Sequence, residues 1–505
     1  MHDAPPSDAP ATVELGHRQI LVVVGGLLTG MALAGLDGTI VSPSLPTIVG
    51  DLGGLESITW VVSAYLLFET VTTPLYGKLG DLFGRPTMFR VAIVIFVGGS
   101  MLCGLAQNLP MLVAFRAVQG IGAGGLMSTA FAVMGDVIPP RQRGRYTGYL
   151  GSVFAVTSVV GPLVGGYLTE QLSWRWIFYV NVPVGIVALV VTSRSLRGLV
   201  KPARVPGRRI DVVGAGLLVS GIGTLLLGLE WGGTEHPWGS PLILGLFAAA
   251  LVVLGAFVVW ERRVDDPVLP LRLFRNDVVT VAGIMSFLAG VTMYVGMIYI
   301  PLFLQVVKDV SVSRSGLLVT PMMLGVLLAA IPTGRLISRT GRYKFTGPLG
   351  FGLLLLGAVL LVGTGAGTPL WAIFAVMAVF GTGIGVLSPP LTVAVQNAVA
   401  RSDLGVATAN TMFLRNLGGA VGIAVYGAVF SSRLAGELVA RLPGGVAADL
   451  GDDVTDLVRQ PSAIAALPDP IEAAVRGATQ ASVHAVFLGA VVAAALGIVV
   501  SLRLR

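Results

Sequence analysis

The sequence has little charge. Of its 505 residues only 12% are Asp, Glu, Lys or Arg, whereas 54% are hydrophobic. Soluble domains carry about 25% charged residues, and a soluble chain of this length would need charge over most of its surface. The composition therefore excludes an ordinary soluble protein and indicates that much of the apolar surface faces lipid.

Cysteine is also nearly absent. The single cysteine, Cys103, lies in an apolar run, so an intramolecular disulfide and a cysteine-ligated zinc site are both excluded. The net charge of +7 does not indicate a nucleic-acid partner, because Lys and Arg occur in short stretches between apolar runs and not in one patch. We expect no nucleic acid, metal or cofactor to bind.

Long apolar runs, by contrast, occupy most of the chain. Fourteen windows stay apolar over roughly 18–25 residues, the length of helix that crosses about 30 Å of hydrocarbon. We interpret them as helices, because they are apolar on all sides whereas the strands of a membrane barrel alternate. The predicted spans are 20–42, 57–76, 89–106, 110–133, 147–169, 176–194, 212–230, 241–260, 279–304, 315–337, 347–365, 369–391, 404–431 and 482–502.

The distribution of Lys and Arg predicts how these spans are oriented. An even number of spans places both termini on one side, and cytoplasmic termini would put most of the 33 Lys and Arg residues in cytoplasmic segments, as the positive-inside rule requires. The first apolar run is too long for the core of a signal peptide, so we interpret it as a retained span after a cytoplasmic tail at 1–18. We expect a monomeric, multi-pass protein of the cytoplasmic membrane, in contact with its lipids.

A repeat divides the chain into two halves. The pattern Gly-Lys-Leu at 77–79 with Gly-Arg at 84–85 recurs as Gly-Arg-Leu at 334–336 with Gly-Arg at 341–342. Each copy follows the second helix of its own set of six, once two spans between the halves are set aside. The two copies therefore stand at matching places in two related sets of helices.

We predict an all-α integral membrane protein with fourteen spans, built from two six-helix bundles and two inserted transmembrane helices. The N-terminal bundle covers 19–195, the linker with the inserted pair covers 196–278, and the C-terminal bundle covers 279–505. The one long polar stretch, 432–480, is rich in Ala, Gly, Asp and Pro, and we predict it to be a partly helical extracellular loop.

Several motifs resemble those of one transporter family. The loop Gly77–Pro86 resembles the loop motif of the major facilitator superfamily, and Arg116 with Gln119 resembles its fourth-helix motif. The fifth-helix motif of its antiporters is similar to Gly161, Pro162, Gly165 and Gly166. The runs that resemble its fourteen-helix drug:proton antiporter branch are 36–41, 45–46, 173–178 and 181–183. The resemblance covers nearly the whole chain and implies two bundles that rock about a central cavity.

Two carboxylates lie within predicted spans. Asp37 is in the outer half of the first span and Glu69 is in the middle of the second. A carboxylate in hydrocarbon is costly unless it is paired, hydrated or protonated. Asp37 is our candidate for a group that binds proton and substrate in turn, and a structural carboxylate bonded to Arg116 or to helix ends is the alternative. Glu69 could attract cationic substrates, take a second proton, or be held by a neighbouring hydroxyl.

Two arginines also lie within spans. Arg116 precedes Gln119 by three residues on one helix face, and its guanidinium must have a partner because it cannot lose its charge. The resemblance implies that Arg116 tunes the acid that carries the proton, and a purely structural ion pair is the alternative. Arg415 is the only charged residue deep in the second half, where it could line the cavity or lock helix packing.

The loop after the second span is the candidate gate, with glycines at Gly77 and Gly84. Asp81 can meet a helix N-terminus, and Arg85 can meet a neighbour's carbonyls, when the bundles close on the cytoplasmic side. The sequence departs from the family pattern, which more often has charged residues there, at Leu82, Pro86 and Ser338. We therefore expect the second loop to carry less of the gating charge. For the glycine motif of the fifth span, the resemblance implies a role against leak, and ordinary helix packing is the alternative.

Aromatic and methionine side chains can line an adaptable apolar cavity, because rings and thioethers accept varied ligands. Packing or lipid-facing positions are the alternative for each of them. The cavity candidates are Tyr65, Phe68, Met293, Tyr294 and Met297.

Together these features indicate a proton antiporter that exports hydrophobic or cationic small molecules, driven by the proton gradient without a cofactor. Export of an endogenous lipid or secondary metabolite is the alternative. A membrane-embedded enzyme or a non-transporting receptor has little support, because the sequence contains no HExxH, GxSxG or Walker A motif.

Overall fold

The computed structural model describes residues 17–41, 44–52, 60–196, 211–233, 235–310, 318–400, 403–442 and 468–504. These residues form sixteen α-helices and short 3-10 and π segments, and their only β pairing is an isolated bridge between Gly232 and His236. The all-α prediction is confirmed. Most of the predicted tail at 1–18, and residues 197–210 of the linker, lie outside the described residues.

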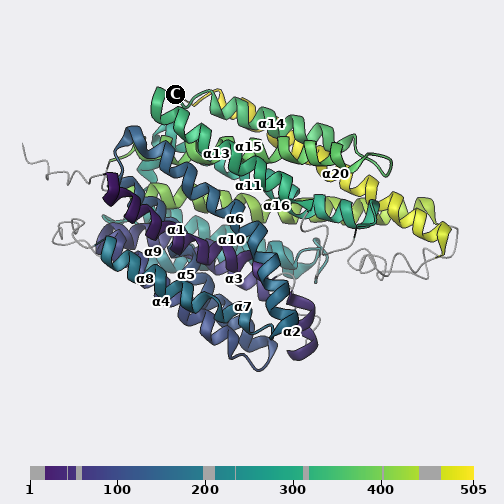
Figure 1. Ribbon diagram of the computed structural model, residues 1–505, viewed down its shortest axis with the longest axis horizontal. Coiled ribbons are helices and arrows are strands. Elements are labelled where there is room, and N and C mark those ends of the chain that lie inside the picture. The colour runs from purple at the N-terminus through teal and green to yellow at the C-terminus, as the bar shows by residue number, and fades with distance from the viewer. Residues whose placement is uncertain are drawn as a thin grey trace, which may run out of the picture.

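Eight helices form the N-terminal bundle, in the lower part of Figure 1. The long ones are α1 (His17–Ile40), α3 (Trp60–Phe83), α4 (Arg85–Gly104), α5 (Leu109–Val137), α6 (Pro140–Gln171) and α8 (Asn181–Ser195), and the short ones are α2 (Leu45–Leu52) and α7 (Trp176–Tyr179). Gly84 separates α3 from α4 by a single residue with a φ of 92°, a conformation that glycine adopts without strain. The turn brings α4 back beside α5, against which it packs.

Two inserted helices follow, α9 (Val212–Trp231) and α10 (Pro241–Glu261). Side chains cap both N-termini, because Asp211 accepts from Gly214 N and Ser240 accepts from Ile243 N. The helix α10 exposes large apolar side chains such as Leu251 (75%) and Val252 (70%), as expected of a helix that faces lipid. The 3-10 segment η3 (Leu271–Arg275) then leads into the second bundle.

The C-terminal bundle lies in the upper part of Figure 1. It consists of α11 (Asp277–Leu302) with its π-helical extension η4 (Phe303–Val307), α13 (Thr320–Thr340), α14 (Thr346–Val362), α15 (Leu370–Ala398), α16 (Leu404–Arg441) and α20 (Asp469–Ser501). Most of its buried side chains form one apolar cluster, to which α9 adds Leu218, Ile222 and Leu226 and α3 of the N-terminal bundle adds Val71. The inserted helices pack mainly against each other, and α9 also contacts α3 of the first bundle and α16 of the second.

The predicted loop at 432–480 is shorter than expected. The helix α16 continues to Arg441 and α20 begins at Asp469, while residues 443–467 lie outside the described residues. Ion pairs four residues apart, Glu437 with Arg441 and Glu472 with Arg476, support the two helix extensions. The polar composition concealed these extensions, because helix ends beyond the hydrocarbon do not need apolar residues.

Each of the fourteen predicted spans overlaps one helix of the structure, with α7 and α8 sharing one span. Among the described residues, eleven helical stretches are long and apolar enough to cross a membrane, with α7 and α8 counted as one, whereas α14 has 17 residues and α3 and α6 are more polar. The count of fourteen spans and the orientation of the termini remain predictions.

Candidate functional site

A fully buried polar network lies inside the N-terminal bundle. Its centre is Asp37 of α1, which is 0% exposed and forms an ion pair with Arg116 of α5. Gln119 donates from Nε2 to Asp37 Oδ1 over 2.8 Å and accepts from Arg116 Nη1 over 2.8 Å. Because residues three apart share a helix face, both α5 side chains reach the same carboxylate.

Asn181 of α8 and Ser100 of α4 extend this network. Asn181 Nδ2 donates to Asp37 Oδ1 over 2.9 Å and to Ser100 Oγ over 3.0 Å, and Ser100 in turn donates to Phe178 O over 2.8 Å. From the sequence, Asn181 could be noticed only because it lies in the run 181–183 that resembles the transporter family. Nothing in the sequence points to Ser100. The network thus joins side chains of four helices, α1, α4, α5 and α8.

The groups around Arg116 stabilise its buried positive charge. Its Nε donates to Val61 O over 2.9 Å, and its guanidinium carbon lies 4.1 Å from the centre of the Tyr65 ring. A buried cation with an anion, acceptors and an aromatic face avoids most of the cost of burial. Protonation of Asp37 would remove that anion, so uptake of one proton would change contacts among α1, α4, α5 and α8.

Glu69 of α3 is half-buried outside this network. Two positive charges act on its carboxylate, and that of Arg415 on α16 has a larger effect than that of Arg116. The neighbouring hydroxyls of Thr72 and Thr73 donate to the main-chain oxygens of Phe68 and Glu69 and not to the carboxylate. Within the described residues, no hydrogen bond holds the Glu69 carboxylate, which distinguishes it from Asp37.

A pocket lies among α11, α14, α15 and α16, and Arg415 provides its one charged side chain within the described residues. Its lining consists of Ser286, Ala289, Met293, Leu354, Ile384, Leu387, Ser388, Leu391, Thr392, Thr411, Met412 and Arg415. Apolar and thioether groups predominate, with four hydroxyls between them. Such a lining suits varied apolar ligands, and the pocket, whose accessible volume is about 30 Å³ in this state, would have to widen to admit one.

The five cavity candidates lie in different surroundings. Met293 lines the pocket, and the Tyr294 ring packs against Gly419 of α16. Phe68 is half-buried, whereas Met297 is 36% exposed. Tyr65 is only 2% exposed, because Arg116 covers its ring. Aromatic character alone does not distinguish a packed ring from one that lines a cavity.

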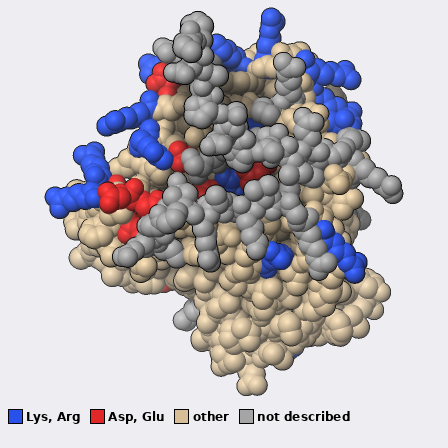
Figure 2. Space-filling model, turned by 90° about the vertical axis from the view of Figure 1, so that its left-hand side faces the viewer, with Lys and Arg blue, Asp and Glu red and all other residues tan. Residues whose placement is uncertain are grey.

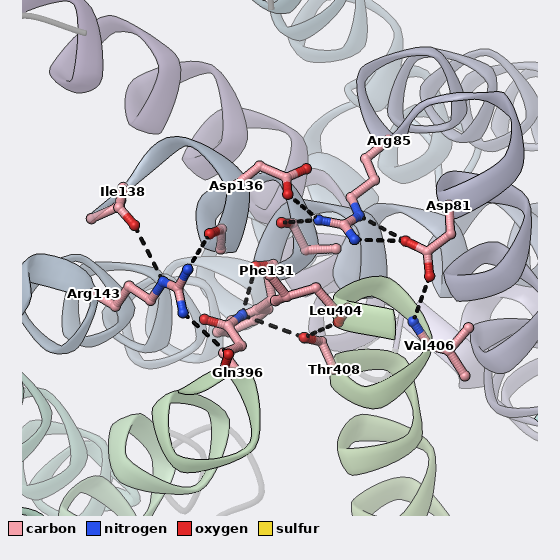
Figure 3. Close-up of polar contacts among 12 residues, drawn as sticks. Asp81, Arg85, Phe131, Asp136, Ile138, Arg143, Gln396, Leu404, Val406 and Thr408 are labelled. Carbon is pink, nitrogen blue, oxygen red and sulfur yellow. Dashed lines mark hydrogen bonds and ion pairs between the residues drawn. The ribbon is translucent and has the colours of Figure 1, made fainter. Parts of the chain in front are cut away.

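The loop between α3 and α4 joins the two bundles at one end of the molecule, which we call the gate end. Arg85 pairs with Asp136 of α5 and donates to Asp81 Oδ1 over 2.6 Å, and Asp81 Oδ2 accepts from Val406 N over 3.2 Å (Figure 3). Val406 lies in the first turn of α16, where free N–H groups favour a carboxylate. Asp81 thus lies at a helix N-terminus of the opposite bundle, whereas Arg85 holds its own bundle together.

A second joint at the gate end involves Arg143 of α6, which is 4% exposed. Its Nη1 donates to Asn397 Oδ1 over 2.9 Å and to Gln396 O over 3.3 Å, both at the end of α15, and Figure 3 shows the contact with Gln396. Gln396 in turn donates to Phe131 O over 2.9 Å. The sequence does not single out Arg143, because Arg141 and Arg145 beside it fit the same topological charge.

Glycines bring helices together on both sides of α6. A Cβ at Gly144 would overlap Gly334 O of α13, so the bundles touch through their backbones at the gate end. A Cβ at Gly161 or Gly165 would overlap Thr39 or Ile40, at the end of α1 near Asp37, whereas a Cβ at Gly166 would meet open space. Two of the three glycines in the motif with Pro162 therefore allow α6 to pack closely against α1.

The run that begins at Ser173 stabilises the end opposite the gate. Trp174 Nε1 and Arg175 Nη1 donate to Asp51 Oδ2 of α2 over 2.9 and 2.8 Å. The indole donor and then the guanidinium hold the pKa of Asp51 below its usual value, so the carboxylate is ionised at neutral pH. In no part of the described chain could a group of three or more His, Cys, Asp or Glu side chains hold a metal ion.

Known proteins are similar to this chain over most of its length. The family model of the Major Facilitator Superfamily matches residues 27–423. An uncharacterized MFS-type transporter of Mycobacterium tuberculosis is 38% identical over 99% of this chain and 72% of its own. Two Bacillus subtilis proteins are also similar: the multidrug transporter protein MdtP, 37% identical over 83% of this chain and 77% of its own, and multidrug resistance protein 3, 32% identical over 93% and 92%.

Solved structures share the fold. The human organic anion transporter MFSD10 superimposes with a TM-score of 0.64 over 95% of this chain and 99% of its own, at 16% identity. The proton:xylose symporter XylE superimposes with a TM-score of 0.59 over 94% and 96%, at 15% identity. At these identities the likeness concerns the arrangement of helices alone.

Proposed function

The chain belongs to the major facilitator superfamily, and from this premise we propose that it is a proton-driven efflux transporter of the cytoplasmic membrane. Members of this family are multi-pass membrane transporters and not enzymes. The relatives support both direction and cargo, since an MFS-type efflux pump of a Fusarium species is 34% identical over 86% of this chain and 78% of its own, and two named relatives are called multidrug proteins. The cargo we propose is a hydrophobic or cationic small molecule.

The buried ion pair between Asp37 and Arg116 carries the proposal of proton coupling. In the described state, Asp37 is a carboxylate saturated by Arg116, Gln119 and Asn181. A proton on Asp37 would cancel its attraction for Arg116 and loosen α1 from α5. Because α6 packs on the end of α1 through Gly161 and Gly165, this change would reach the helix that joins the bundles at Gly144 and Arg143.

The gate contacts support alternating access. Asp81, Arg143 and Gly144 join the bundles at the gate end, so this state is closed there. We place the gate end and both termini in the cytoplasm, and Figure 2 supports this because Lys and Arg side chains surround that face. Loss of these contacts would open the cavity to the cytoplasm, with the bundles at 19–195 and 279–505 moving as units about the inserted pair within 196–278.

Glu69 and the pocket of the C-terminal bundle support the proposed cargo. The pocket contributes thioether and aliphatic walls through Met293, Met412 and Ile384. Glu69 adds a carboxylate that is half-buried and without a hydrogen bond in the described chain, which would attract an organic cation. An apolar cation could therefore place its charge beside Glu69 and its apolar surface against these walls.

The test is proteoliposome transport with an imposed pH gradient and ethidium as the cargo. We expect gradient-driven movement in the wild type and its loss in Asp37→Asn. The control is Glu437→Gln, a partly exposed carboxylate whose partner is Arg441 on the same helix, and this variant should transport normally. Undiminished proton-driven transport by Asp37→Asn would refute coupling through Asp37. No movement by the wild type would refute this cargo class and favour a lipid or metabolite substrate.

A further inference from the structure

The two arginines within helices differ in what surrounds them. Arg116 has an anion, two oxygen acceptors and an aromatic ring. Arg415 is half-buried on α16, and among the described residues no atom forms a hydrogen bond or an ion pair with its guanidinium. Its Nε is buried and has no partner. The side chain therefore lies on the pocket wall with its donors unused.

An arginine in this position is costly unless something pairs with it. The guanidinium stays charged and presents five N–H donors in a fixed plane, which matches the two oxygens of a carboxylate. Glu69 and Tyr294 interact with it electrostatically, but neither forms a hydrogen bond with it. The described residues thus supply a counter-charge that is not in hydrogen-bond contact, and none of them forms a hydrogen bond with the guanidinium of Arg415.

The surroundings of Arg415 suit the acidic end of an apolar molecule. Thr392 and Thr411 line the same pocket, and their side chains provide polar surface there. Met412 and Leu391 continue the wall with apolar surface. A ligand with one carboxylate on an otherwise apolar body would pair the charge and bury its remaining surface against these side chains.

We propose that Arg415 binds a carboxylate of the cargo while Glu69 faces its cationic group, so that the preferred cargo is a zwitterion with an apolar body. This inference rests on the proposed efflux function and narrows its cargo. Glu69 lies on α3 of the N-terminal bundle and Arg415 on α16 of the C-terminal bundle. A zwitterion would therefore contact both bundles with opposite charges, whereas a simple cation would be attracted by one and repelled by the other.

The experiment compares two fluorescent dyes that differ at one group. Rhodamine 110 has a free carboxylate beside its cationic ring system, and rhodamine 123 is its methyl ester. Uptake of each dye into proteoliposomes under a pH gradient gives a ratio of acid to ester, which is insensitive to how much protein is folded. The variants are Arg415→Gln, which removes the charge, and Arg415→Lys, which keeps the charge without the planar pair of donors.

We expect the wild type to favour the acid, and Arg415→Gln to lower the acid-to-ester ratio about tenfold or more, the usual effect of losing a charged hydrogen bond. The ratio for Arg415→Lys should lie between those of the wild type and Arg415→Gln. The control is Arg441→Gln on the same helix, where Glu437 is the partner, and its ratio should equal that of the wild type. If Arg415→Gln loses all transport, the acid-to-ester ratio of Arg415→Lys provides the test instead. A ratio below that of the wild type then supports the proposal.

Two results would overturn the inference. One is a wild type that transports the ester as well as the acid, and the other is an unchanged ratio in the Arg415 variants, which would make Arg415 a counter-charge for Glu69 alone. Phosphatidylglycerol in the vesicles tests a lipid phosphate as the occupant, because such an occupant would compete with the acid and lower the ratio as the lipid fraction rises. Failure of the efflux function itself would look different, since the wild type would then move neither dye nor ethidium.

Discussion

Replacing Arg143 by Gln should open the gate end. Arg143 donates to Asn397 and Gln396 of the C-terminal bundle over 2.9 and 3.3 Å, and to Gly135 O and Ile138 O of its own bundle over 2.6 and 3.2 Å. Only the contacts between bundles are lost when the gate opens. The bond to Asn397 is short and the one to Gln396 is near the limit of a hydrogen bond, so together they stabilise the closed state by about 2 kcal/mol. This corresponds to about a thirtyfold shift of the equilibrium towards the open state.

The shift can be measured by double electron–electron resonance, which gives the distance between spin labels on cysteines introduced at Phe83 and Lys344. Both residues are exposed at the gate end, one in each bundle, and Cys103 is fully buried and can be replaced by Ala. Arg90→Gln is the matched control, because within the described residues its side chain donates to Pro86 O and Thr87 Oγ1 of its own helix α4. A distance distribution for Arg143→Gln that equals that of the control would refute the reasoning.

Three further predictions follow from the contacts of the N-terminal bundle. Asp37→Asn should destabilise the protein by about 3–5 kcal/mol, because it leaves the Arg116 charge unpaired; the thermal exposure of Cys103 to a fluorogenic maleimide measures this, and equal midpoints for Asp37→Asn and wild type would contradict it. The double variant Asp37→Asn with Arg116→Gln should recover part of the loss, and an additive loss would show that the two residues are not coupled. Gly165→Ala should lower the midpoint more than Gly166→Ala, because only the first Cβ meets Ile40 O; equal effects would argue against the close packing of α6 on α1.

The sequence alone determined the class of the fold and most of its helices. Lipid requires each span to satisfy its own backbone and to present apolar side chains on all sides, so the apolar windows predicted helices without any knowledge of their neighbours. The same constraint made charged residues within spans conspicuous, which is why Asp37, Arg116 and Arg415 could be selected as functional candidates.

The tertiary structure decided which of these residues meet. Asp37 and Arg116 are 79 positions apart, and only the packing of α1 against α5 makes them partners. Arg415 could have found a partner in the same way, and only the packing shows that none of the described residues supplies one. Arg143 shows the reverse case, since three arginines within five residues serve topology equally well and only the fold directs one of them to the end of α15. Spans are determined by the solvent around each helix, whereas pairs depend on how the helices pack, and that information is spread over the whole chain.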